Sequence, residues 1–335
     1  MEDTIRASVR GALIALAILV AGAHSTIQAA WNEVPLPSLS GDFVSYQTGY
    51  LSDGRFVYGT GSSLARQDTF GGSAISSYTN SQSWDPSFVT IFNDSLGAIG
   101  AGGFGGGSAI YTFDPSDLNT AFTPISGLSI QNYSAFFHDA SSLLVGGNNG
   151  TGGAHSINYV TLDGLTNQIL IDDISTFSGD FARDAAGNLF VSDNDDLNLY
   201  RFTAAQVDDA ILNATALSIT DGVLVTTLDK NGSIAVDSQG RIWSTGFQTN
   251  GLDLFDPSSG TTATFVPGFA NTNYSVYTFS DGVTDYVGYL NAEGFFSGDA
   301  LNFGYDADTN LVPEPSGIVL VALGLSLVVW RRRNR

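Results

Sequence analysis

The chain has 335 residues, of which 33 are acidic and 12 basic, giving a formal net charge of −21 at pH 7. A surface of this sign repels nucleic acid and anionic lipid, which excludes nucleic-acid binding as a function. The chain contains no cysteine, so disulfides, thiolate metal sites and a cysteine nucleophile are excluded as well. Its 39 glycines and 12% aromatic residues are typical of short strands joined by tight turns.

The N-terminus predicts export. Arg6 and Arg10 precede an apolar stretch at residues 11–23, and small residues follow as far as Ala30. This order of basic, apolar and small residues is that of a secretory signal peptide. We therefore expect residues 1–30 to form a signal helix that directs the chain to the Sec export machinery, and the mature body to begin at Trp31.

An internal repeat organises the body. Each unit opens with a turn in which Asp or Asn bonds its own backbone, a glycine three residues on takes a positive φ in most units, and an apolar strand follows. The units start at residues 51, 94, 139, 184, 237 and 291. Their spacings of 43, 45, 45, 53 and 54 residues are typical of propeller blades.

Two units resemble known blade repeats. The unit at residues 237–244 resembles the blades of two-component-regulator propellers, and the unit at 184–191 resembles those of NHL propellers. The resemblance implies an all-β propeller over residues 31–311, with six blades, or seven if the N-terminal strands form their own. A two-sheet sandwich is the rival fold, but it does not predict a 45-residue period.

Two further elements are predicted within the propeller. We expect residues 42–48 to close the ring by pairing with the last blade. We also expect a short helix at residues 204–212, with Thr203 as its N-cap.

A cluster of acids is the candidate metal site. Asp193, Asp195 and Asp196 follow a predicted strand, and carboxylates in a turn are typical ligands of calcium. The segment lacks the glycine and the closing glutamate of an EF-hand loop. An acidic blade turn without metal is therefore the alternative.

The weak candidates for ligand binding are Trp84, His138 and His155. The two histidines could ligate a metal or do acid–base work. They lie 17 residues apart within one unit, so ordinary turn histidines are the alternative. Trp84 suits stacking on a polysaccharide ligand, whereas Trp243 in a repeat strand is expected in the core. No residue is assigned a catalytic role.

The C-terminus carries a sorting signal by resemblance. Val312, Pro313, Glu314 and Pro315 precede an apolar run at 317–330, and Arg331, Arg332 and Arg333 follow. The run would span only ~21 Å as a helix, less than the ~30 Å hydrocarbon core, and the arginines fit a cytoplasmic end. This order resembles the PEP-CTERM signal, which implies that residues 312–335 form a short transmembrane helix read by exosortase.

The resemblance also implies a location and a role. The chain would be anchored transiently in the inner membrane of a Gram-negative bacterium and then reach the cell surface or the medium. Because that class is associated with exopolysaccharide and biofilm formation, we expect a non-enzymatic binding or matrix module and lean against an enzyme. The alternative is a propeller enzyme of lactonase, lyase or glycosidase type, with an Asp/Glu/His site in the central channel.

Overall fold

The computed structural model describes most of the chain between Trp31 and Asp306. The described residues are 31–35, 45, 47–60, 63–67, 75–79, 86–101, 109–128, 131–148, 155–175, 180–193, 196–229, 232–246, 251–265, 272–280, 285–291 and 300–306. The expected signal helix (1–30), the short transmembrane helix and the sorting motif lie outside them. Among the described residues, no helix is long and apolar enough to cross a membrane.

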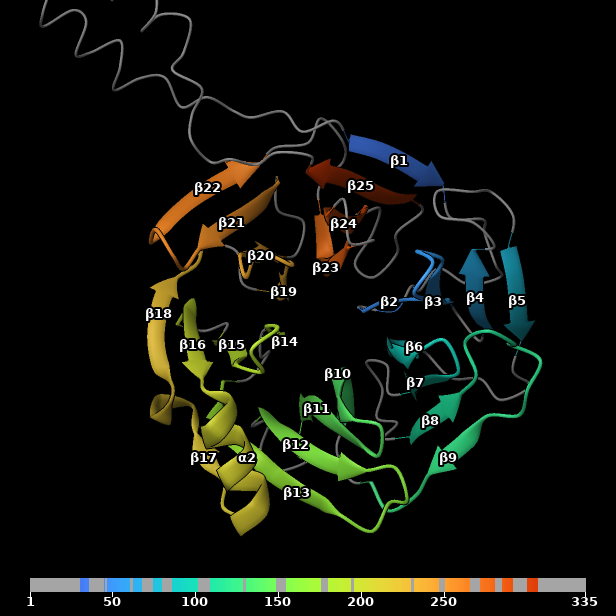
Figure 1. Cartoon of the computed structure of the whole chain (residues 1–335), viewed down its shortest axis with the longest axis horizontal. Helices are drawn as coiled ribbons and strands as arrows, with labels where there is room; N and C mark the ends of the chain where they lie inside the picture. Colours follow the sequence, from blue (N-terminus) through green and yellow to red (C-terminus); the bar gives the residue numbers. More distant parts are fainter. Residues whose placement is uncertain are drawn as a thin grey trace, which may run out of the picture. The chain divides into compact units, whose positions relative to one another are not determined.

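The described strands form six sheets, each with four antiparallel strands, and one of them has an additional fifth strand that pairs in parallel. Figure 1 shows the sheets following one another in chain order around a common centre. In each sheet, one strand lies nearest that centre; these inner strands are β2, β6, β10, β14, β19 and β23. The prediction of an all-β propeller is therefore confirmed.

The first three sheets cover residues 49–174. The first contains β2 (Gly49–Tyr50), β3 (Phe56–Thr60), β4 (Ser63–Gln67) and β5 (Ile75–Thr79). The second contains β6 (Pro86–Asn93), β7 (Leu96–Ala101), β8 (Ala109–Phe113) and β9 (Thr123–Ile125). The third contains β10 (Gln131–Asp139), β11 (Ser142–Asn148), β12 (His155–Thr161) and β13 (Asn167–Ile174), with β17 (Leu217–Ser218) parallel to β13.

The other three sheets complete the ring. The fourth contains β14 (Phe181–Arg183), β15 (Leu189–Asp193), β16 (Asn198–Phe202) and β18 (Val223–Thr227). The fifth contains β19 (Ser233–Val236), β20 (Ile242–Thr245), β21 (Leu252–Asp256) and β22 (Thr261–Phe265). The sixth contains β23 (Thr272–Ser280), β24 (Asp285–Asn291), β25 (Ala300–Asp306) and β1 (Trp31–Pro35).

The sixth sheet joins the two ends of the propeller, but not through the predicted segment. β1 pairs antiparallel with β25, so that Trp31 lies opposite Gly304. The expectation that residues 42–48 close the ring is wrong. In that segment Gln47 forms an isolated parallel bridge to Phe88 on β6 instead. Trp31–Pro35 has the right place for closure because it lies far enough upstream of β2 to reach the outer side of the last sheet.

The repeat motif forms the turn after an inner strand. In the unit that starts at Asp184, the Asp184 carboxylate accepts the Asn188 N–H at 2.8 Å, and Gly187 has φ 84°. The same geometry recurs at Asp237, where Gly240 has φ 77°. The sixth unit was misplaced, because Asn291 is the last residue of β24 and not the start of such a turn.

The core lies between neighbouring sheets. Four clusters of buried apolar side chains fill successive gaps from the first sheet to the fifth, and the largest includes Phe181, Phe202 and Val207. Val207 lies on α2 (Ala204–Asn213), which begins after Thr203 with a complete capping box to Gln206. The predicted helix is confirmed. A one-turn helix, η2 (Ile219–Asp221), follows β17.

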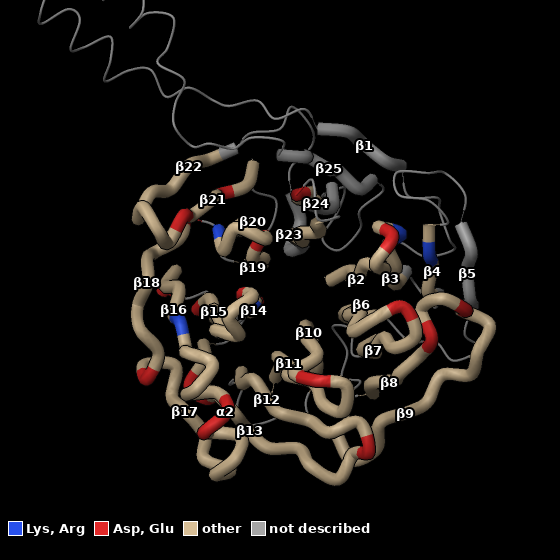
Figure 2. The backbone as a smooth tube through the Cα atoms, in the orientation of Figure 1, with Lys and Arg blue, Asp and Glu red and all other residues tan. Residues whose placement is uncertain are grey.

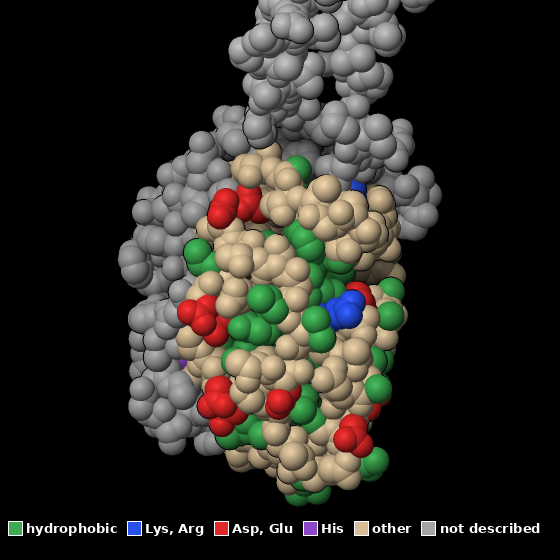
Figure 3. Space-filling model, turned by 90° about the vertical axis from the view of Figure 1, so that its left-hand side faces the viewer, with side chains coloured by type: hydrophobic (Ala, Val, Ile, Leu, Met, Phe, Trp, Pro, Cys, Tyr) green, Lys and Arg blue, Asp and Glu red, His purple; other side chains and the backbone are tan. Residues whose placement is uncertain are grey.

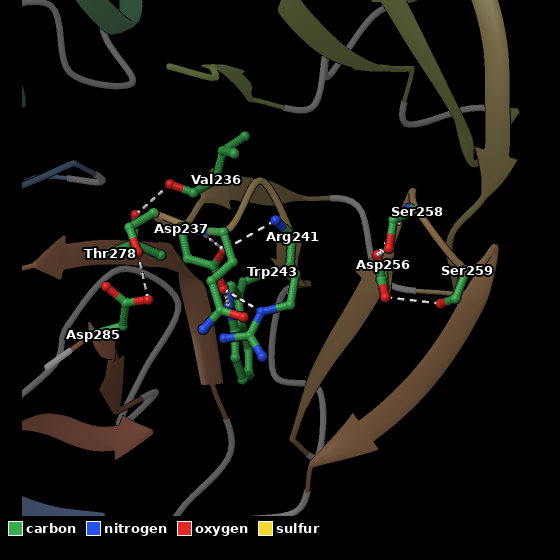
Figure 4. Close-up of polar contacts among 11 residues, drawn as sticks. Val236, Asp237, Arg241, Trp243, Asp256, Ser258, Ser259, Thr278 and Asp285 are labelled. Atoms are coloured by element: carbon green, nitrogen blue, oxygen red, sulfur yellow. Dashed lines mark hydrogen bonds and ion pairs between the residues drawn. The ribbon is translucent and has the colours of Figure 1, made fainter. Parts of the chain in front are cut away.

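Polar contacts also join the fifth and sixth sheets (Figure 4). The Thr278 hydroxyl donates to the Val236 carbonyl at 2.7 Å, and the Ser238 hydroxyl donates to Asp285 at 2.7 Å. Within the fifth sheet, Asp237 accepts from Arg241 Nε at 2.7 Å and from Trp243 Nε1 at 3.0 Å. Trp243 is 2% exposed, so its expected place in the core is confirmed.

The outside of the ring is acidic, with apolar side chains scattered among the acids. Figure 2 shows the positions of Asp and Glu residues spread around the ring, with few Lys and Arg residues among them. Figure 3 views the side of the ring that carries β18 and α2, where hydrophobic side chains lie between acidic ones. Val223 and Leu224 on β18 are 55% and 54% exposed.

Candidate functional site

Polar side chains gather where the inner strands begin. Three of them, Gln47, Asp180 and Ser233, stand four residues before the turn of their repeat unit. The corresponding inner strands, β2, β14 and β19, surround the centre of the ring in Figure 1. Their common position in the repeat places them on one face of the propeller.

Asp180 is the central group of this face. Its Oδ1 accepts the Phe181 N–H at 2.9 Å, and its Oδ2 accepts the Ser233 hydroxyl at 3.2 Å. The Ser134 hydroxyl on β10 also bonds to the carboxylate. Side chains from three successive inner strands thus meet at one carboxyl group.

The environment of Asp180 favours its protonated form. Burial raises the pKa of this carboxyl to about 6, because desolvation outweighs the bonds from Phe181, Ser134 and Ser233. Part of the residue's surface nevertheless stays accessible to solvent. A carboxyl with a pKa raised in this way can both take and give a proton near neutral pH.

The groups around Asp180 are themselves held in place. The Ser233 hydroxyl oxygen accepts the Val276 N–H of β23 at 3.2 Å, which ties the site to the sixth sheet. The Ser192 hydroxyl donates to the Asp180 backbone carbonyl at 3.0 Å. Ser233 and Ser192 are 1% and 0% exposed, so both hydroxyls have fixed surroundings.

Gln47 crosses from the first sheet to the third. Its Nε2 donates to the Ala135 carbonyl at 2.8 Å, and its Oε1 accepts the Ala135 N–H at 3.0 Å. The backbone N–H and carbonyl of Ala135 at the inner edge of β10 are thus hydrogen-bonded, as they would be by a further strand. Beside it, the fully buried Ser87 hydroxyl donates to the Asn132 side chain. The polar side chains on this side of the face are therefore held in place by hydrogen bonds between sheets.

The two predicted histidines do not meet. His155 begins β12, where it is 7% exposed and stacks on Tyr133 with ring centroids 5.5 Å apart. His138 lies near the far end of β10, with its Nε2 3.8 Å from Asp208 on α2. Burial lowers the pKa of both imidazoles. They therefore lie at opposite ends of the third sheet and cannot form one site.

The other predicted site residues are described only in part. Asp193 ends β15, is 6% exposed and accepts a hydrogen bond from the Ser175 hydroxyl. Asp196 is exposed in the following turn, while Asp195 and Trp84 lie outside the described residues. In the part of the chain that the structure describes, no group of three or more His, Asp or Glu side chains could hold a metal ion. Calcium at this turn stays a prediction.

Sequence reasoning missed Asp180 and its two serines. The motif search followed the turn residues of each unit, and Asp180 stands ahead of the turn. The sequence does contain a signal for the site. Residues 47, 180 and 233 are polar at the position where an apolar strand begins in the repeat unit. Aligning the units four residues further upstream would have found it.

Comparisons with known proteins show the fold. The structure is similar to the calcium-binding protein regucalcin from Agrobacterium tumefaciens, with 13% identity, a TM-score of 0.61, and coverage of 82% of this chain and 93% of that one. It is similar to a luciferin-regenerating enzyme at 10% identity and a TM-score of 0.59, covering 82% and 95%. A candidate gluconolactonase matches at 15% identity and a TM-score of 0.58, covering 83% and 93%.

Neither of the sequence-level searches gives a match. No family model matches the chain. No curated protein matches it either.

These findings correct the functional expectation. We expected a non-enzymatic binding or matrix module and leaned against an enzyme. Several of the solved propellers that the chain resembles are instead enzyme-type propellers, among them the luciferin-regenerating enzyme and the candidate gluconolactonase. No contiguous catalytic motif marks such a site in the sequence, because the polar groups at Asp180 come from separate blades.

Proposed function

We propose that the protein is a hydrolase that opens a small cyclic ester at Asp180. The observation that carries the proposal is the Asp180 carboxyl, whose pKa burial raises to about 6 and which accepts a hydrogen bond from Ser233 of the next blade. Such a group is half ionised close to neutral pH, which is the condition for an efficient general base. Similarity to a candidate gluconolactonase supports lactones as the substrate class.

The proposed reaction uses Asp180 twice. Its carboxylate takes a proton from a water molecule as the water oxygen attacks the lactone carbonyl carbon. The tetrahedral intermediate then collapses, the ring C–O bond breaks, and the leaving oxygen receives that proton from Asp180. The product is a hydroxy acid, and Asp180 returns to its ionised state. General catalysis of this kind contributes roughly 10²–10⁴-fold.

Two serines act as positioning residues in this scheme. Ser233 bonds one carboxylate oxygen of Asp180 at 3.2 Å, and Ser134 bonds the same group. Each of these bonds favours the ionised form, so together they keep the pKa from rising further. Loss of these bonds would raise the pKa of Asp180 further. It would also leave the carboxylate without the contacts that hold its orientation.

Calcium is a separate part of the proposal. One similar structure is a calcium-binding protein, and the turn after β15 carries several carboxylates. Asp193 and Asp196 alone do not supply the six to eight oxygens that calcium prefers. A calcium ion would therefore need further oxygen ligands, and none of the hydrolytic steps above depends on one.

Export and surface sorting complete the proposal. The signal peptide at 1–30 would direct the chain to the Sec machinery, and the motif from Val312 to Pro315 with its arginine tail would be read by exosortase at the inner membrane. Deleting residues 312–335 should abolish surface sorting and leave the propeller folded. Recovery of the truncated chain in the same surface fraction would contradict the sorting proposal.

The hydrolase proposal is tested with lactones. Purified full-length protein is incubated with glucono-δ-lactone and γ-butyrolactone, and acid release is followed with a pH indicator. The wild type should hydrolyse the lactones faster than they hydrolyse spontaneously. In Asp180→Asn, the rate above the spontaneous one should be roughly 10²–10⁴-fold lower. Asp256→Asn, which changes an exposed carboxylate in a turn of the fifth sheet, should keep the wild-type rate. Equal rates for wild type and Asp180→Asn would remove Asp180 from catalysis.

A further inference from the structure

A pocket lies at the end of the inner strands opposite to Asp180. It has a volume of about 680 Å³ and is lined by the ends of β2, β6 and β23 together with the turns after β2 and β6. β6 runs from the face of Asp180 at Pro86 to this pocket at Asn93, a length of about 23 Å at ~3.3 Å per residue. The pocket is therefore separate from the proposed hydrolytic site.

Aromatic rings form much of the pocket wall. Tyr50 stacks on Phe279 with centroids 5.1 Å apart and an interplanar angle of 18°, and both line the pocket. Phe92 lines it as well and is 43% exposed. Burial raises the pKa of the Tyr50 hydroxyl well above its usual value, so the ring stays a neutral phenol. Because Phe279 also stacks on Tyr286 with centroids 5.9 Å apart, the aromatic surface offered to a ligand comes chiefly from Phe92.

One carboxylate lies beside these rings. Asp94 is the only formally charged residue among the described residues that line the pocket. Its Oδ1 accepts the Ser52 N–H at 2.8 Å and its Oδ2 accepts the Ser52 hydroxyl at 2.5 Å, and these bonds lower the pKa of the carboxyl. Asp94 is therefore ionised at neutral pH, and a carboxylate retains further lone pairs for another partner.

A basic residue near Asp94, Arg55, has an acidic partner of its own. Arg55 is close enough to lower the pKa of Asp94, but its Nε is bonded to Asp53 Oδ2 at 2.7 Å. Around the pocket, the whole chain carries a net charge of −21. The local charge and the overall field both favour a cation and disfavour an anion.

We propose that this pocket binds a small organic cation with an alkylated ammonium group. Aromatic faces attract such a cation through their quadrupoles, and the alkyl groups add apolar contact. Asp94 supplies the opposite charge at the edge of the rings. The volume of about 680 Å³ lies within the usual range of small-molecule pockets.

Choline and its neutral isostere 3,3-dimethylbutan-1-ol provide the test, because the two differ by N⁺ against carbon. Isothermal titration of the full-length protein should show saturable binding of choline, with the alcohol roughly tenfold weaker or more. Asp94→Asn and Phe92→Leu should each lower the affinity for choline by about three- to tenfold. Thermal melts check that both variants remain folded.

The matched control is Asp256→Asn. Asp256 is also a carboxylate bonded by a serine N–H and hydroxyl, but the serine is Ser258 of its own turn, and the residue lies in the fifth sheet. It should leave choline binding unchanged. The proposal is overturned if choline does not bind, if the alcohol binds equally well, or if Asp256→Asn weakens binding as much as Asp94→Asn does. None of these outcomes depends on hydrolysis at Asp180.

Discussion

The Ser233 hydroxyl donates to Asp180 Oδ2 at 3.2 Å and accepts the Val276 N–H at the same distance. One hydroxyl therefore connects the inner strands of the fourth, fifth and sixth sheets. A chain of this kind can form only when these three neighbouring sheets have packed against one another. The proposed site is consequently a property of the packed blades and not of any one blade.

Asp180→Asn should stabilise the fold at pH 8. The folded-state pKa is raised from 3.8 to about 6, so the ionised carboxyl opposes folding at alkaline pH. At ~1.36 kcal/mol per pKa unit, removing the charge should add about 1–3 kcal/mol, the lower value allowing for the accessible part of Asp180. Urea denaturation at pH 8 measures this gain. A loss of stability would show that the carboxylate is held favourably after all.

The stability of the wild type should depend on pH through the same group. Between about pH 4 and pH 6 the folded state binds a proton at Asp180 that the unfolded state has released. The contribution of Asp180 is therefore fully present below about pH 4 and is lost as pH rises through 6. The difference in unfolding free energy between Asp180→Asn and wild type should shrink between pH 8 and pH 4. A constant difference would contradict the raised pKa.

Hydrolysis should show the opposite dependence on pH. The proposed base works only when ionised, so kcat/KM should rise with pH and level off above the pKa of about 6. Ser233→Ala removes a bond to the ionised form and should move this inflection to higher pH. A change in rate without a shift of the inflection would indicate that Ser233 has only a structural role.

The sequence predicted what depends on local chemistry. The Asp184 turn with Gly187 and the Thr203 cap of α2 are both set by neighbours within four residues, and both are confirmed. Closure by Trp31–Pro35 was missed because it pairs residues about 270 positions apart, such as Trp31 with Gly304. Nothing within the segment itself distinguishes that partner from other strands.

The candidate site was harder to predict for the same reason. Asp180, Ser134 and Ser233 belong to three blades, and only the ring brings them together. The histidines, by contrast, are close in sequence but lie at opposite ends of the third sheet, because His138 is near the end of β10 and His155 begins β12. Proximity along the chain was the wrong guide in both cases.

Calcium at millimolar concentration should raise the melting temperature if the turn after β15 binds it. With a dissociation constant of ~10⁻⁴ M, 1 mM calcium would add about 1.4 kcal/mol, or a few degrees. Asp196 is exposed, so Asp196→Asn should remove the shift without disturbing the core. Asp163→Asn, another exposed turn carboxylate, is the control. Calorimetry compares the melting temperatures in calcium and in EDTA. Identical melting temperatures would contradict a calcium site at this turn.

Two Asp–Arg pairs should differ widely in their contribution to stability. Asp237 and Arg241 are 6% and 4% exposed, with Nε and Oδ2 2.7 Å apart, and the Asp237 carboxylate also accepts the Trp243 N–H. Asp237→Ala leaves the guanidinium buried without this partner and should cost about 3–5 kcal/mol. Asp53 makes a 2.7 Å contact with Arg55, but its side chain is 53% exposed. Asp53→Ala should cost less than about 1 kcal/mol. Urea denaturation of the two variants compares them directly, and equal losses would mean that burial does not decide the strength of these pairs.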